Sequence, residues 1–343
     1  MPNITDLPCE IIAGVLRELD DIHHLRNAAL SCRHLHSAYK EYPSLAVDVL
    51  TSNVNPALLP YSVALWEASG LSRPRTHNSI KQLLDTLYDE PRALTERLRH
   101  MPTPTVLWMT HLHGQIETVA NEFASNAWGK LEELTTLSEY IDADLAKYLN
   151  FIVLLSFYRR PVEKEPHLGP PEILSLTSSE QFRLHRAFYR VGLTLHLFGG
   201  EEIGQGEYSS PNEQIELFLS RHPPLASSQI RDLLGTVGEQ SRDSSLLEVL
   251  NTSTERQCKS FTEDSTDDEL KALEPRPNTE DTDLGPFCTW KSVFTFKDHP
   301  RARWAFKFNH FNRDCAYVFW DLARVERHNL PKIFNEIWQY DSI

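Results

Sequence analysis

The spacing of the apolar side chains constrains the fold most, because apolar residues recur every three or four positions over several long stretches. Two such stretches cover 112–127 and 131–155, on either side of Gly129. A third covers 180–198, with Ser179 as a plausible first residue of the helix. Two glycines follow directly after residue 198. This spacing places apolar side chains on one face of an α-helix. The sequence therefore predicts a mostly α-helical protein, with separate helices before and after Gly129.

Composition divides the 343 residues into four parts. Residues 1–48 form a short helical unit and residues 49–237 a larger helical domain. Residues 238–286 are rich in Ser, Thr, Asp and Glu, a composition typical of a disordered acidic linker. Residues 287–343 hold 14 of the 34 aromatic residues, which we expect to pack back on the helical domain.

Charge and cysteine content limit the partners and the compartment. The chain has 34 Lys and Arg against 48 Asp and Glu, a net charge of −14, so we expect no nucleic-acid partner. No apolar run approaches the about 20 residues of a membrane helix, and the first residues do not resemble a secretory signal. The five cysteines are widely spaced and form no C-x-x-C pair. These features favour a cytoplasmic or nuclear protein with no membrane contact.

The N-terminal unit carries more large aliphatic side chains than so small a body can bury. A unit of about 40 residues lies near the minimum that folds alone, because it covers too little of its apolar surface. The surplus predicts a face that a partner covers. The residues assigned to this face are Leu7, Pro8, Ile11, Ile12, Leu16, Leu19, Leu25, Leu30 and Leu35.

The same residues resemble an F-box. Leu7-Pro8-Cys9-Glu10-Ile11 matches the opening L-P-x-E-[IL] of that motif, and Cys32-Arg33-His34-Leu35 matches its closing C-[RK]-x-[LW]. In the F-box family, three helices insert an apolar face into a Skp-type adaptor, which joins the protein to the cullin scaffold of a ubiquitin ligase. Further segments resemble the remainder of a fungal F-box-like family, namely 183–190 with 197–199, 218–225 and 316–324.

The resemblance implies a three-helix F-box followed by a domain that captures a client protein, with no catalytic residue of its own. The aromatic residues Trp304, Phe306 and Phe308 lie among basic residues and are our candidates for binding that client. Two readings outside a ligase stay open. The chain could be an adaptor-bound scaffold that recruits no cullin, or its first helices could be an ordinary hairpin packed on their own domain.

A third alternative is a metal-dependent hydrolase. His111 and His113 have the H-x-H spacing of a shared metal site, but the sequence offers no third ligand nearby. The motifs G-x-S-x-G, H-E-x-x-H and the phosphate-binding P-loop are all missing from the sequence. We therefore expect no enzymatic activity, no metal and no cofactor.

Overall fold

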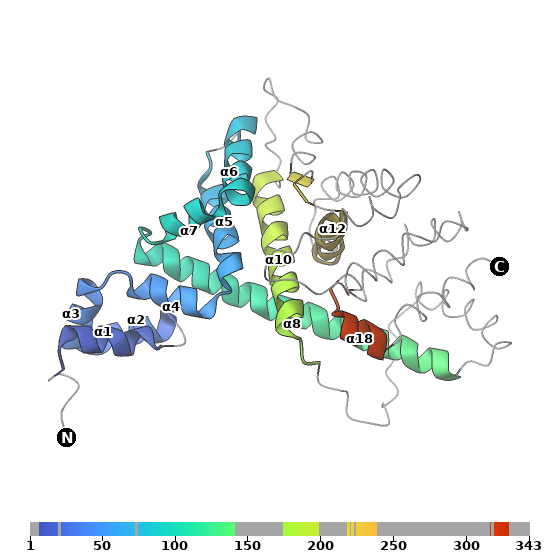
Figure 1. The fold of residues 1–343 in the computed structure, drawn as a ribbon, viewed down its shortest axis with the longest axis horizontal. Helices are drawn as coiled ribbons and strands as arrows, with labels where there is room; N and C mark the ends of the chain where they lie inside the picture. Colours follow the sequence, from blue (N-terminus) through green and yellow to red (C-terminus); the bar gives the residue numbers. More distant parts are fainter. Residues whose placement is uncertain are drawn as a thin grey trace. The chain divides into compact units, whose positions relative to one another are not determined.

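The computed structural model describes residues 7–19, 22–72, 75–140, 174–198, 218–219, 221–222, 224–238, 316 and 319–328. These residues form α-helices and one short 3-10 helix and contain no β-strand, which confirms the predicted mostly α-helical fold (Figure 1). The chain divides into two compact units. The first comprises Met1–Ala120 with His185–Arg221, and the second comprises Asn121–Leu184 with His222–Ile343.

Three short helices open the first unit: α1 (Cys9–Arg17), α2 (Ile22–Ser31) and α3 (Arg33–Glu41). They contact one another, and α4 (Leu45–Asn53) packs against α1 and α2. Arg17 on α1 donates from Nε to Oδ2 of Asp48 on α4 over 2.9 Å. The helix α4 therefore runs across the boundary expected at residue 48, and five of its nine residues are buried.

A helical core follows α4. The 3-10 helix η2 (Pro56–Leu58) leads into α5 (Leu59–Gly70), and then come α6 (His77–Asp89) and α7 (Pro91–Leu98). Seven of the twelve residues of α5 are buried, and α5, α6 and α7 contact one another. The hydroxyl of Tyr39 on α3 lies 3.0 Å from that of Thr103 at the start of α8, which links the N-terminal helices to this core.

One long helix, α8 (Thr103–Tyr140), passes through Gly129 without a break. The prediction of separate helices on either side of Gly129 is therefore wrong. A glycine inside a helix costs only about 1 kcal/mol relative to alanine. Its neighbours Trp128 and Leu131 are buried, and this burial outweighs that cost. The part of the second predicted stretch beyond residue 140 lies outside the described residues.

The helix α10 (Ser178–Phe198) confirms the stretch predicted over 180–198 and begins one residue before the expected first residue, Ser179. Thr177 accepts a hydrogen bond at Oγ1 from the Glu180 amide over 3.1 Å, and Glu180 accepts one at Oε2 from the Thr177 amide over 3.0 Å. This reciprocal pair is a capping box, which satisfies two amides that a helix start leaves open. The last described helices are α12 (Pro224–Gly238) and α18 (Leu322–Arg327).

Several predicted features lie outside the described residues. The acidic linker over 238–286 does so except for Gly238, the last residue of α12. The aromatic candidates Trp304, Phe306 and Phe308 do so as well. Among the described helices, none combines the length and the apolar character that crossing a membrane requires.

Candidate functional site

Exposed apolar side chains concentrate on the first two helices. Ile11 and Val15, one turn apart on α1, are 53% and 50% exposed, and Leu30 on α2 is 67% exposed. Among the residues whose side-chain burial the structure describes, only Val119 on α8 is also a large exposed aliphatic, at 43%. We call Ile11, Val15 and Leu30 the N-terminal apolar residues. Their exposure leaves an aliphatic surface that burial against a partner would stabilise.

The residues before α1 are fixed by backbone contacts. The carbonyl of Pro8 accepts hydrogen bonds from the amides of Ile11 and Ile12 at 3.1 and 3.2 Å, which starts the helix. The Nε2 atom of His34 on α3 lies 3.1 Å from the Leu7 carbonyl oxygen. Pro8 is exposed and Leu7 is half-buried. The two residues that begin the F-box resemblance are therefore anchored through their backbone and accessible through their side chains.

Three residues assigned to the adaptor face are instead core residues. Ile12, Leu16 and Leu25 are 0%, 2% and 1% exposed, so they hold α1 and α2 to their neighbours and cannot touch a partner in this conformation. Leu19 and Leu35 are half-buried. Val15 was not among the residues assigned to the adaptor face, although its position four residues after Ile11 places both on one helix face.

A second group of interest is a charged cluster in the second unit, at the start of α10 and of α18. Arg183, whose side chain is 1% exposed, forms an ion pair with Asp321 and donates to the Phe319 carbonyl oxygen over 2.5 Å. Asp321 also accepts a hydrogen bond from the Thr177 hydroxyl. Each buried charge thus has an opposite charge and further hydrogen bonds, which is the condition for burying it at a tolerable cost.

Glu180 carries the other half of this cluster. Its carboxylate accepts from Arg324 at both oxygens, with Nε to Oε1 at 2.7 Å and Nη2 to Oε2 at 2.8 Å, a bidentate pair. Oε1 also accepts from the Asp321 amide at 3.0 Å. The cluster joins two segments that the sequence analysis singled out, 183–190 and 316–324. The T-x-x-E pattern from Thr177 to Glu180 was a sequence signal for the start of α10, the helix that carries Glu180 and Arg183.

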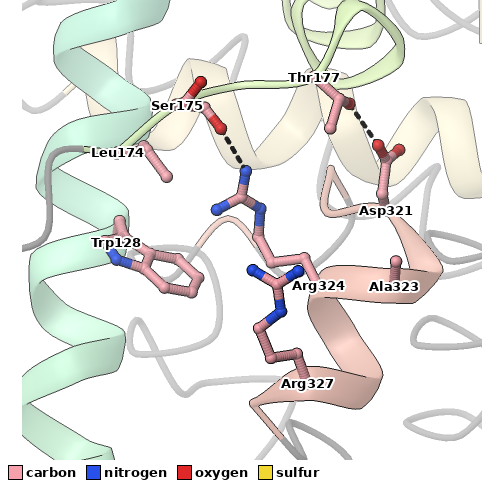
Figure 2. A pocket seen from close by; sticks show the side chains of 8 residues that line it. All are labelled: Trp128, Leu174, Ser175, Thr177, Asp321, Ala323, Arg324 and Arg327. Atoms are coloured by element: carbon pink, nitrogen blue, oxygen red, sulfur yellow. Dashed lines mark hydrogen bonds between the residues drawn. The ribbon is translucent and has the colours of Figure 1, made fainter.

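A pocket of about 240 Å³ adjoins the cluster. Figure 2 shows Trp128 of α8 on one side and Arg324 and Arg327 of α18 on the other, with Leu174 and Ser175 nearby. The guanidinium carbon of Arg324 lies 5.1 Å from the ring centre of Trp128 and 5.6 Å from that of Trp320, both in cation–π range. The pocket therefore combines an aromatic wall with two cationic side chains.

The two histidines of the hydrolase alternative lie on different faces of α8. Residues two apart in an α-helix are separated by about 200° around its axis. His111 is exposed, whereas Nδ1 of His113 lies 3.1 Å from the Tyr189 hydroxyl and its ring centre 5.4 Å from that of His185. The described residues contain no cluster of His, Cys, Asp or Glu suited to a metal ion. The pair therefore gives no support to a shared metal site.

Burial sets the charge state of the two neighbouring histidines His113 and His185. It lowers the pKa of His113, against a smaller upward effect from Glu117. Burial also lowers the pKa of His185 to about 4, with a further contribution from His113. Because both values lie below the ordinary one of 6.5, both rings are neutral at neutral pH and pack as core side chains.

Comparison of the whole chain with protein-family models, with curated proteins and with solved structures finds no match, so any assignment of function rests on the residues described above.

Proposed function

We propose that this chain is a non-catalytic substrate receptor of the F-box type, which links a client protein to a Skp-type adaptor and a cullin-based ubiquitin ligase. The observation that carries the proposal is the exposure of Ile11, Val15 and Leu30 on α1 and α2, between the two ends of the F-box-like motif at 7–11 and 32–35. Ubiquitin transfer would take place on other subunits. The receptor would act by holding the client close to them, which raises its effective concentration.

The division between buried and exposed side chains on α1 supports this role. Ile12 and Leu16 already secure the helix to its own unit, so Ile11 and Val15 are not needed for that purpose. Full burial of such a side chain is worth about 1.5–3 kcal/mol, and roughly half of each remains to be covered. The N-terminal apolar residues together should therefore contribute about 3 kcal/mol to adaptor binding, which corresponds to somewhat more than a hundredfold in affinity.

Co-elution of the purified full chain with a fungal Skp-type adaptor tests the proposal. Leu30→Asp should abolish the complex, because a carboxylate would have to lose its hydration in an apolar interface. Val119→Asp is the matched control, since Val119 is an exposed aliphatic residue of the same unit and should tolerate the change. Equal co-elution of the two variants with the adaptor would count against the assignment.

Addition of a cullin to the adaptor complex separates a ligase receptor from a scaffold. A receptor predicts that chain, adaptor and cullin elute as one species. Co-elution with the adaptor alone, with cullin excluded, would instead favour the scaffold reading.

A further inference from the structure

The pocket beside Trp128 contains a cation that no described residue neutralises. Arg324 is held by both oxygens of Glu180, and Arg183 is held by Asp321. Arg327 lines the same pocket, is exposed, and makes no ion pair or hydrogen bond with any described residue. Of the three charged residues that line the pocket, Asp321 and Arg324 are therefore paired, and the surplus positive charge lies on Arg327.

This surplus is local and opposes the charge of the whole chain. The protein has a net charge of −14, so a free guanidinium in a pocket is not explained by a generally basic surface. Glu326 lies on the same helix but does not line the pocket. An anion entering the pocket would therefore meet Arg327 without first displacing a carboxylate of the described residues.

The remaining walls define the shape of that anion. Trp128, Leu174 and Ala323 supply apolar surface, and Arg327 supplies the unpaired charge (Figure 2). Asp321 and Arg324 also line the pocket, but each is held in an ion pair with a residue outside it. A volume of about 240 Å³ is below the roughly 300–1,000 Å³ of pockets that enclose a whole small ligand. It suits one side chain with an apolar stem and a charged end. A single free guanidinium carries one positive charge, which balances one carboxylate held by two parallel hydrogen bonds. The same charge would neutralise only half of a dianionic phosphate.

We propose that this pocket binds the side chain of a glutamate in a client peptide, with the carboxylate on Arg327 and the methylene stem against Trp128. The role of that peptide as a client rests on the proposed function, whereas its binding to the pocket needs no adaptor. The pocket would thus select acidic clients and leave the N-terminal apolar residues free for the adaptor.

The test uses the full chain labelled with 15N at its seven tryptophan indoles. Three capped pentapeptides of sequence Ala-Ala-X-Ala-Ala, in which X is Glu, Gln or phosphoserine, are titrated in turn. We expect the Glu peptide to shift one indole signal saturably, with a dissociation constant of about 1 mM, and the Gln peptide to shift none. Arg327→Gln should weaken binding of the Glu peptide at least tenfold, while Arg92→Gln, an exposed arginine in the first unit, should not change it.

Three results would overturn the proposal: equal shifts with Glu and Gln peptides, no saturable shift with the Glu peptide, or binding that Arg327→Gln leaves unchanged. Tighter binding of the phosphoserine peptide than of the Glu peptide would overturn the assignment to a carboxylate. A full chain that binds the Glu peptide but not the adaptor would refute the receptor role alone. A full chain that binds the adaptor but not the Glu peptide would refute the pocket alone.

Discussion

The buried ion pair between Arg183 and Asp321 offers a sharp test of the structure of the second unit. In Asp321→Asn, the guanidinium of Arg183 keeps its place with 1% of the side chain exposed but loses its counter-charge. Removing one partner of a buried pair typically costs about 3–5 kcal/mol, because the other charge is left uncompensated away from water. We expect a loss of that size, a large share of the total stability of a domain.

A double-mutant cycle separates this effect from lost packing. Arg183→Met combined with Asp321→Leu removes both charges and leaves apolar side chains of similar size. Because no isolated charge remains, the double variant should be more stable than the sum of the two single changes predicts, by at least about 2 kcal/mol.

Urea unfolding followed by far-UV circular dichroism and tryptophan fluorescence gives the free energies of unfolding. Arg327→Gln on the same helix is the control and should lie within about 0.5 kcal/mol of the unchanged protein, because Arg327 is exposed. The reasoning fails if Asp321→Asn is no more destabilising than Arg327→Gln, or if the two changes of the cycle simply add.

Two further predictions concern the first unit. Gly114 lies inside α8 with open space where a side chain would go, so Gly114→Ala should raise the free energy of unfolding by about 0.5–1 kcal/mol. Gly192→Ala should gain less, because the new Cβ would lie 3.2 Å from Cδ2 of Leu65; equal urea midpoints for both variants would contradict this. The pKa of His185 is about 4 in the folded chain against 6.5 ordinarily, so the unfolded state binds more protons between these values and stability should fall as the pH drops from 6.5 towards 4. His185→Gln should flatten that part of a stability profile measured from pH 4 to 7, and an unchanged slope would show that other groups cause it.

Helix positions were predictable from the sequence where one apolar stripe dominates. The stretch predicted over 180–198 has apolar residues at helical spacing, and the structure confirms it as α10. Gly129 was misread as an interruption because a single glycine is a weak helix breaker, and burial of its neighbours decided the outcome.

The candidate site was less accessible to sequence reasoning. On α1, Ile11 with Val15 and Ile12 with Leu16 form two adjacent apolar stripes, and only packing determines which one faces inward. The pair of Arg183 and Asp321 joins positions 138 residues apart, a distance that no local spacing reveals. The H-x-H spacing of His111 and His113 was ambiguous for a related reason, since it points to a metal site on a strand but to opposite faces on a helix.

Isothermal titration of the Skp-type adaptor into the full chain tests most directly whether the exposed aliphatic face of α1 is a binding surface. Replacing Ile11 and Val15 with alanine removes about half of two buried-side-chain contributions, or about 2 kcal/mol, so affinity should fall about 30-fold with the helical content unchanged. An affinity within threefold of the unchanged protein would show that this face does not bind the adaptor.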